Sequence, residues 1–150
     1  MAEKTIRVLF LCTGNSCRSQ MAEGWARKLG GGAVEAFSAG TEPKGLHPLA
    51  VKVMAELGVD ISHQASKHLD SFVSQRFDYV ITVCDKAKES CPVWPHAKEH
   101  IHWSFDDPAA AMGSEAERLK VFKRVQAEIK RRVDLFLLAH KVPTAEARAP

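Results

Sequence analysis

The sequence predicts an α/β protein in which a four-stranded parallel sheet lies between helices, a three-layer α/β/α arrangement. Short apolar runs rich in β-branched residues alternate with longer segments whose apolar residues recur at helical spacing. This alternation is typical of a parallel sheet covered on both faces. The chain has 150 residues, 45% of them hydrophobic, which is enough for one core. We therefore assign residues 1–141 to a single domain and residues 142–150 to a flexible polar tail.

The first predicted strand, Ile6–Leu11, is an apolar run interrupted only by Arg7, and it ends at Cys12. A helix then starts at Ser19 and stops at the glycines 30–32. Its apolar residues recur at helical spacing and are Met21, Ala22, Trp25, Ala26 and Leu29.

Three more strands are predicted further along the chain, at Val34–Ser38, Tyr79–Val83 and Ile101–Trp103. A second helix ends before Gly58. Its predicted apolar face consists of Ala50, Val53, Met54 and Leu57.

The last helix is predicted within Ser114–Ala139, where Ser114 and Glu117 have the spacing of a capping box at the helix start. Its apolar face is formed by Phe122, Val125, Ile129, Val133 and Phe136.

Charge and hydropathy exclude several classes of function. The formal net charge of +3 results from 21 basic and 18 acidic residues spread along the chain, and the longest basic run is Lys130–Arg132. This balance tolerates an anionic ligand but does not indicate nucleic-acid binding. The apolar run Val8–Cys12 is too short for a signal peptide or a membrane span. We expect a cytoplasmic monomer with no nucleic-acid or membrane partner.

The chain has four cysteines, Cys12, Cys17, Cys84 and Cys91. In a reducing compartment, thiols usually carry out chemistry or bind metal. Cys12 and Cys84 each follow a predicted strand. Since ligands of parallel sheets bind at the carboxyl ends of the strands, we expect these two thiols at the same edge.

The segment Cys12–Ser19 joins a strand to the start of a helix, which is the arrangement of an anion-binding loop. Gly14 helps the chain to curl, and Arg18 offers a planar fork for two oxyanion oxygens. The substrate-binding residues predicted here are Thr13, Gly14, Asn15, Ser16, Cys17, Arg18 and Ser19.

Cys12 is the candidate nucleophile, because backbone N–H groups and the helix dipole stabilise a thiolate and so lower its pKa. Ser19 could donate a hydrogen bond to the sulfur. The alternative, a cysteine that simply ends a strand as a small buried hydrophobe, does not explain the Arg-Ser pair that follows after five intervening residues.

Cys12–Ser19 resembles the phosphate-binding loop of the low-molecular-weight protein tyrosine phosphatases and of the thioredoxin-coupled arsenate reductases that share their fold. The stretch Ser38–Thr41 is similar to one common to both groups, and Asp107-Pro108 matches their general-acid loop. These features do not choose between phosphatase and reductase.

The segment Cys84–Pro92 resembles the redox segment of the arsenate reductases, with Cys84 and Cys91 at the positions of their second and third cysteines. Residues seven apart in a helix are about 10 Å apart, beyond the roughly 7 Å that a disulfide tolerates. A bond between these cysteines would therefore require the segment to unwind, and Pro92 and Pro95 do not favour a stable helix. The alternatives are two ordinary core cysteines or a zinc site with His96, His100 and His102.

The resemblance implies a mechanism without cofactor or metal. Cys12 attacks arsenic, Asp107 protonates the departing oxygen, and Arg18 holds the remaining oxygens. Cys84 then attacks the Cys12 sulfur and arsenite leaves, after which Cys91 attacks Cys84 and passes the disulfide to thioredoxin, with glutathione-type thiols as the alternative reductant.

Two other functions are compatible with these features. A low-molecular-weight tyrosine phosphatase needs only Cys12, the loop and Asp107, although Ala109–Met112 replace the tyrosines that usually follow the acid, which favours a small substrate. A thiol sensor that captures arsenite or zinc would use Cys12, Cys84 and Cys91 without turnover.

Some positions have weaker signals. For Cys17 we expect a structural role. Glu23 and Ser38 resemble positions of a potassium site in some reductases, and Lys67 falls where those proteins have an aspartate, so its ammonium is expected to replace the cation. Solvated positions are expected for His47, His63, His68 and His140.

Overall fold

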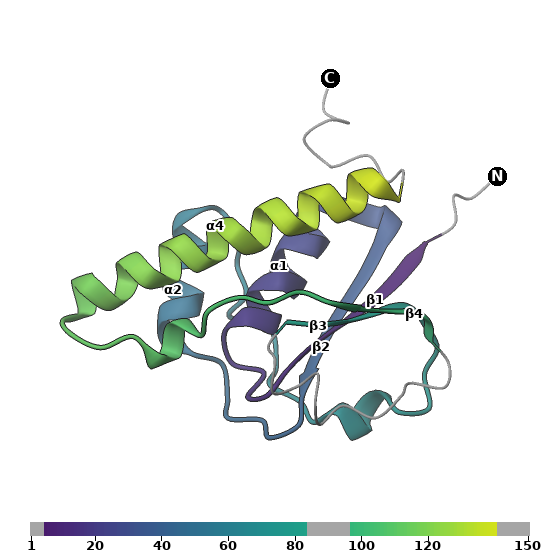
Figure 1. Ribbon diagram of the computed structural model, residues 1–150, viewed down its shortest axis with the longest axis horizontal. Coiled ribbons are helices and arrows are strands. Elements are labelled where there is room, and N and C mark those ends of the chain that lie inside the picture. Colours follow the sequence, from purple (N-terminus) through teal and green to yellow (C-terminus); the bar gives the residue numbers. More distant parts are fainter. Residues whose placement is uncertain (1–4, 84–96, 141–150) are drawn as a thin grey trace.

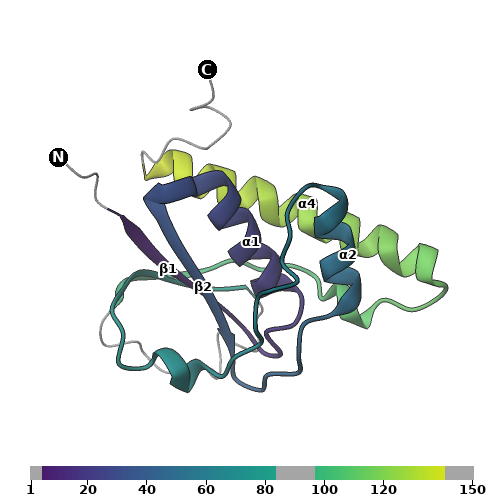
Figure 2. The same ribbon diagram turned by 180° about the vertical axis from the view of Figure 1, so that it is seen from behind.

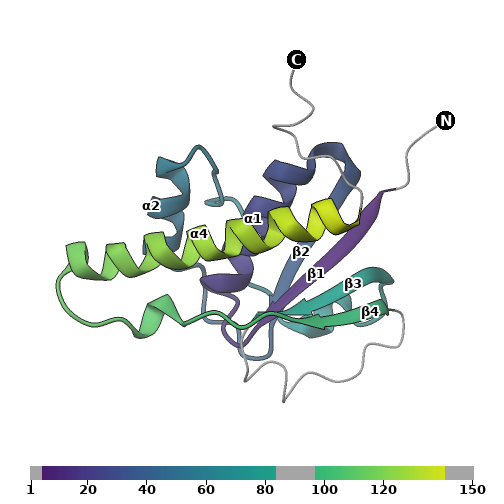
Figure 3. The same cartoon turned by 45° about the horizontal axis from the view of Figure 1, so that its top comes forward.

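The computed structural model describes residues 5–83 and 97–140 (Figure 1). Its sheet has four parallel strands in the order β2-β1-β3-β4, which lie side by side in Figure 3. They are β1 (Ile6–Cys12), β2 (Val34–Gly40), β3 (Phe77–Thr82) and β4 (Ala97–His102). The predicted four-stranded parallel sheet is confirmed.

One face of the sheet is covered by α1 (Arg18–Gly30), α2 (Pro48–Glu56) and α4 (Glu115–Ala139), and α4 lies along both other helices (Figures 1 and 2). Within the described ranges, the 3-10 turn η2 (Leu69–Phe72) packs on the opposite face. The sheet therefore has a layer on each side, and the predicted three-layer α/β/α class is confirmed. Shorter 3-10 turns are η1 (Gly31–Ala33) and η3 (Pro108–Ala110).

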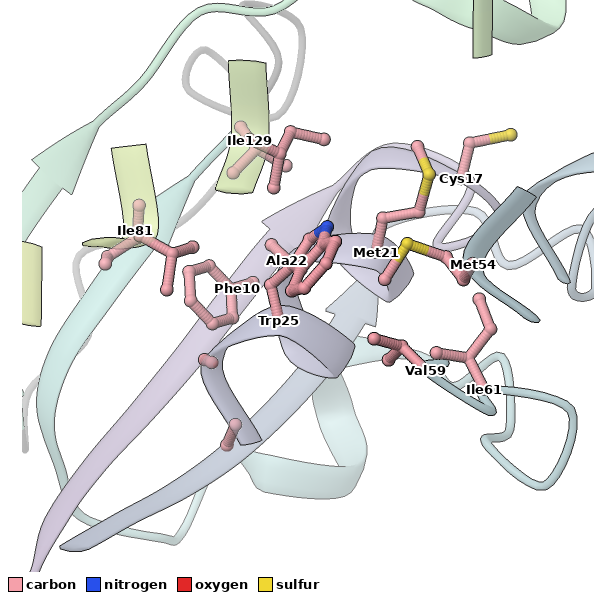
Figure 4. Close-up of a cluster of buried hydrophobic side chains, with 14 of the residues drawn as sticks. Phe10, Cys17, Met21, Ala22, Trp25, Met54, Val59, Ile61, Ile81 and Ile129 are labelled. Carbon is pink, nitrogen blue, oxygen red and sulfur yellow. The ribbon is translucent and has the colours of Figure 1, made fainter. Parts of the chain in front are cut away.

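The side chains of β1 alternate between two hydrophobic clusters, as a strand buried on both faces requires. Val8 and Phe10 pack toward α1 and α4, whereas Leu9 and Leu11 pack toward η2. The larger cluster centres on Trp25 and continues to Cys17 at the start of α1 (Figure 4). The anion-loop end of β1 is thus anchored in the core on both sides.

The boundaries of several elements differ from the prediction. The ladder between β1 and β2 continues to the pair Cys12 and Gly40, so β2 is two residues longer than expected. α2 ends at Glu56, and Leu57 is its C-cap with 45% of its surface exposed, so its predicted place on the apolar face is wrong. The helix turns at Gly58, whose φ of +78° a residue with a side chain rarely adopts.

The last helix follows the prediction closely. Ser114 accepts a hydrogen bond from the backbone N–H of Glu117, and the Glu117 carboxylate accepts one from the backbone N–H of Ser114, so the capping box is confirmed. All five residues of the predicted apolar face are buried. In the described part of the chain, no helix has the length and apolarity of a membrane span.

Candidate active site

The candidate site lies where β1 ends at Cys12, and α1 starts at Arg18 after a five-residue loop. Cys12 is 4% exposed, and its backbone pairs with Gly40 of β2. Position 40 has no room for a side chain, since a Cβ atom there would lie 2.5 Å from the Thr13 carbonyl oxygen. The loop is therefore packed directly against the end of β2.

The four consecutive carbonyl groups of residues 13–16 all accept hydrogen bonds from chain segments outside the loop or from α1. The donors, at 2.8 to 3.3 Å, are the backbone N–H groups of Glu42, Lys44 and His47, the Ser66 hydroxyl and the Gln20 amide. In a trans peptide the carbonyl and the following N–H point in opposite directions, and the described chain has no cis bond. Outward carbonyls therefore turn the N–H groups of residues 14–17 toward the inside of the loop, where an anion would bind.

Asn15 fixes the turn of this loop. Its φ of +45° is left-handed, and its side chain is completely buried. Its Oδ1 accepts hydrogen bonds from the Lys67 backbone N–H and the Gln20 amide, and its Nδ2 donates to the Ser19 hydroxyl at 2.8 Å. A hydroxyl that accepts this bond still has its own proton to donate, as the predicted contact of Ser19 with a Cys12 thiolate requires.

Arg18 is positioned from outside the loop. Its Nη1 donates to the Phe105 carbonyl at 3.0 Å, and its Nη2 is 3.7 Å from Oδ2 of Asp107. Its Nε is buried and has no hydrogen-bond partner among the described residues. A buried donor without a partner is costly, so this atom suits a ligand oxygen.

The two aspartates of the acid loop point to different neighbours. Asp107 caps η3 through the Ala109 N–H and lies beside Arg18, with 46% of its side chain exposed. Asp106 instead forms an ion pair of 3.0 Å with Arg124 of α4. Asp107 is thus the carboxylate next to the anion loop, as the sequence predicts for the acid.

Cys17 differs from a reactive thiol. It is 2% exposed, and burial in the core raises the pKa of its thiol to about 11, while the Ser16 hydroxyl at 3.7 Å lowers it to a smaller extent. A thiol with this pKa stays protonated at neutral pH and is a poor nucleophile. Its backbone N–H belongs to the loop, but its side chain belongs to the core.

His47 has a structural place that its sequence context did not indicate. Its ring packs on Phe122 at 4.9 Å between centroids, and its Nδ1 accepts the backbone N–H of Leu49 at the start of α2. Burial, and to a lesser extent the charge of Arg118, lower the pKa of His47. The expected solvated position is therefore wrong for His47, which is half-buried.

Cys84 and Cys91 lie outside the described residues, as does His96. The residue before Cys84 is described: the Val83 backbone N–H donates to the Leu11 carbonyl at 2.8 Å, and Leu11 precedes Cys12. His102, one of the alternative zinc ligands, has its Nδ1 2.7 Å from the Thr82 hydroxyl. Among the described residues, no group of three potential ligands could hold a metal ion.

The cation beside Glu23 is not the predicted one. The Lys67 ammonium donates to the Ala65 carbonyl and lies over the Phe72 ring, so the expectation that it replaces a bound cation is wrong. The cation that pairs with Glu23 is Arg27, with Nη2 2.6 Å from the Glu23 carboxylate. The i,i+4 spacing of Glu23 and Arg27 on one helix is the sequence signal that could have indicated this pair.

Residues 7–146 match the family model described as low molecular weight phosphotyrosine protein phosphatase. Among sequence relatives, the arsenate reductase of Halalkalibacterium halodurans is 50% identical over 86% of this chain and 93% of that protein. The arsenate reductase of Bacillus licheniformis is 51% identical over 91% of this chain and 96% of that protein.

The similar solved structures are likewise arsenate reductases and a low molecular weight phosphatase. An arsenate reductase in the phosphate-binding state has a TM-score of 0.78 and 36% identity over 92% of this chain and 99% of its own. A thioredoxin-dependent arsenate reductase of Corynebacterium glutamicum has a TM-score of 0.63 and 30% identity over 91% of this chain and 65% of its own. A low molecular weight protein tyrosine phosphatase from T. tengcongensis has a TM-score of 0.73 and 28% identity over 90% of this chain and 99% of its own.

Proposed function

Because the chain belongs to the low molecular weight phosphotyrosine protein phosphatase family and is 50% identical to an arsenate reductase over most of its length, we propose that it reduces arsenate to arsenite. The observation that carries the proposal is the anion loop. The loop carbonyls accept hydrogen bonds from groups outside the loop, so the loop N–H groups point inward. The buried Nε of Arg18 has no hydrogen-bond partner among the described residues. Arsenate is a small tetrahedral oxyanion of the kind that such a loop binds.

The first step forms an arsenic–sulfur bond. The Cys12 thiolate attacks arsenic, and an arsenate oxygen leaves as water after it takes a proton from Asp107. Arg18 and the loop N–H groups hold the other oxygens. The distance of 3.7 Å between Oδ2 of Asp107 and Nη2 of Arg18 supports this proposal, because it puts the proposed acid next to one of the proposed oxyanion donors.

The second step transfers two electrons. The Cys84 thiolate attacks the Cys12 sulfur, the electron pair of the sulfur–arsenic bond moves to arsenic, and arsenic(V) becomes arsenic(III). Arsenite leaves, and a Cys12–Cys84 disulfide remains. Cys91 then attacks Cys84, which releases Cys12 as a thiolate and leaves a Cys84–Cys91 disulfide. The hydrogen bond from the Val83 N–H to the Leu11 carbonyl supports the attack of Cys84 on Cys12, because it joins the residues that precede these two cysteines.

The reductant that closes the cycle is proposed to be thioredoxin. The support is a similar protein described as thioredoxin-dependent, together with the dithiol that the relay leaves to be regenerated. Glutathione-type thiols are the alternative reductant. We further propose that the enzyme acts as a monomer in the cytoplasm, where thiols remain reduced between turnovers.

The decisive experiment maps disulfides after a single turnover. Reduced protein is mixed with arsenate, free thiols are alkylated, and the remaining disulfides are identified by peptide mass. We expect a Cys84–Cys91 disulfide in the wild type and a Cys12–Cys84 disulfide in Cys91→Ser. Phosphate is the matched control, since it fits the same loop but does not accept electrons. Full turnover of Cys91→Ser with thioredoxin would refute the relay.

A second candidate, a tyrosine phosphatase, is favoured by the family and by the presence of Asp107. The segment after the proposed acid has no aromatic side chain that could pack against the ring of a phosphotyrosine, because it consists of Ala109–Ala111 and the exposed Met112. Comparing aryl phosphate hydrolysis with arsenate-dependent NADPH oxidation through thioredoxin distinguishes the two. We expect Cys12→Ser to abolish both activities, and Cys84→Ser to abolish only the second.

A further inference from the structure

Glu23 is a carboxylate of α1 that is 3% exposed, so its charge needs partners inside the protein. Its Oε1 accepts the Ser38 hydroxyl at 2.6 Å, and its Oε2 is 2.6 Å from Nη2 of Arg27. The same Nη2 also donates to the Ala36 carbonyl of β2. Arg27 therefore neutralises a buried charge and ties α1 to the strand that ends beside the anion loop.

The second terminal nitrogen of the Arg27 guanidinium, Nη1, starts a series of hydrogen bonds that reaches the anion loop. Nη1 of Arg27 donates to Oε1 of Gln64 at 3.1 Å, which fixes the orientation of that amide. Nε2 of Gln64 then donates to Oε1 of Gln20 at 2.8 Å. Nε2 of Gln20 donates in turn to both the carbonyl and Oδ1 of Asn15, at 3.0 and 3.1 Å.

This series of hydrogen bonds has a fixed direction. An amide has one acceptor oxygen and one donor nitrogen, so the donor at Arg27 determines which way Gln64 and then Gln20 present their groups. Gln20 is completely buried and Gln64 is 9% exposed, so water does not readily replace these partners. The last member, Asn15, is itself the left-handed residue of the loop.

We propose that Arg27 is a positioning residue for the anion loop, acting through Gln64 and Gln20 on Asn15. This rests on the proposed function only in that the loop binds a tetrahedral oxyanion. Without the guanidinium, the Glu23 carboxylate loses its counter-charge and Gln64 loses the donor that orients it. The loop N–H groups are then less well ordered, and oxyanion binding weakens.

The test uses phosphate as a probe that the loop binds without turnover. Phosphate affinity is measured by titration calorimetry on reduced wild type, Arg27→Ala, and the control Arg131→Ala, which removes an exposed arginine of α4. We expect the Kd for phosphate to rise on the order of tenfold in Arg27→Ala, which is the usual size of a coupling between two linked sites in a protein. In the control, the Kd should stay within twofold of the wild type.

Rescue separates positioning from general destabilisation. Arg27 and Gln64 line a surface pocket of about 180 Å³, so a small cation has access to the place of the missing side chain. Millimolar guanidinium chloride should restore phosphate binding in Arg27→Ala, whereas sodium chloride at equal ionic strength should not. Gln64→Met should weaken binding as well, and the double variant should lose less than the sum of both single losses.

The phosphate affinity of the Arg27 variants decides whether Arg27 positions the loop. Unchanged phosphate Kd in folded Arg27→Ala, or a loss that guanidinium does not reduce, overturns the role of Arg27. If Arg27→Ala does not fold, Arg27→Lys replaces it, because an ammonium can pair with Glu23 but cannot also orient Gln64; a wild-type Kd in that variant overturns the proposal. A wild type that binds no phosphate would instead contradict the anion loop and the proposed function.

Discussion

Gly40→Ala tests whether the loop geometry depends on close packing against β2. A Cβ atom at this position would lie 2.5 Å from the Thr13 carbonyl oxygen, 2.8 Å from that of Cys12 and 3.0 Å from the Asn15 side chain. Two of these contacts are to backbone, so the strain cannot be relieved by rotating a side chain. To bring the closest contact to an ordinary 3.4 Å, the loop must move by about 0.9 Å away from β2.

Two effects follow from this displacement. Overpacking of this kind costs about 1 to 3 kcal/mol of unfolding free energy. A misplacement of about 1 Å at a catalytic site can lower the rate about 100-fold. Because the Thr13 and Cys12 carbonyls belong to the loop itself, we expect kcat/KM for arsenate to fall by about two orders of magnitude in Gly40→Ala, much more than its stability loss explains.

Two other glycines provide matched controls. A Cβ atom on Gly24 would lie 2.7 Å from an Ile61 methyl group, so Gly24→Ala strains the core against side chains only. A Cβ atom on Gly32 would have no neighbour within 4 Å. Urea unfolding and arsenate kinetics are measured for all three variants. Gly24→Ala should lose stability but keep kcat/KM within about threefold, and Gly32→Ala should keep both. If Gly40→Ala retained wild-type kcat/KM, the packing argument would be wrong.

Four more predictions follow from the site. Arg18→Lys should raise the KM for arsenate about tenfold or more, since an ammonium cannot replace the planar fork; equal steady-state constants would contradict this. Asp107→Asn should slow adduct formation in a rapid-quench assay by about 100-fold, whereas Asp106→Asn, which breaks an exposed ion pair with α4, should change it less than threefold. Iodoacetamide at pH 7 should alkylate the nucleophile long before Cys17, because the raised pKa of Cys17 keeps it a thiol until the pH approaches about 11; rapid labelling of both would contradict its burial. Potassium salts should not accelerate the wild type relative to sodium salts, because a guanidinium already neutralises the buried carboxylate.

The sequence predicted those parts of the site whose signals are local. Cys12 through Ser19 joins a strand to a helix within eight residues, so periodicity and a short motif locate the loop. Asp107 was assigned as the acid because Asp107-Pro108 resembles the general-acid loop of the family; the structure places Asp107 beside Arg18, and its role as the acid stays a prediction. The capping box at Ser114 depends on a spacing of three residues and was likewise predictable.

Contacts between distant segments were not predictable in this way. The Gln20–Gln64 hydrogen bonds join residues 44 apart, and nothing in either local sequence favours the pairing. The assignment of Lys67 failed because a position in a motif does not tell where a long, flexible side chain points. Leu57 was misplaced because helical spacing continues past Glu56 in the sequence, while the chain turns at the left-handed Gly58.

The anion loop by itself does not distinguish phosphate hydrolysis from arsenate reduction. Both reactions need a thiolate, inward N–H groups and an acid, and both begin with attack of Cys12 on a tetrahedral oxyanion. They differ in what attacks next: water attacks phosphorus in a phosphatase, whereas a second thiol attacks sulfur in the reductase and leaves the electron pair on arsenic. Arsenate reduction therefore requires a second thiol close to Cys12, and such a thiol can come from the chain segment that follows the strand next to β1. That strand is β3, whose last residue paired with β1 is Thr82, and the N–H of the next residue, Val83, donates to the carbonyl of Leu11, which precedes Cys12. The order of the strands thus places Val83, the residue before Cys84 in the sequence, beside the residue that precedes Cys12, and the identity of the attacking group, rather than the shape of the loop, determines the reaction.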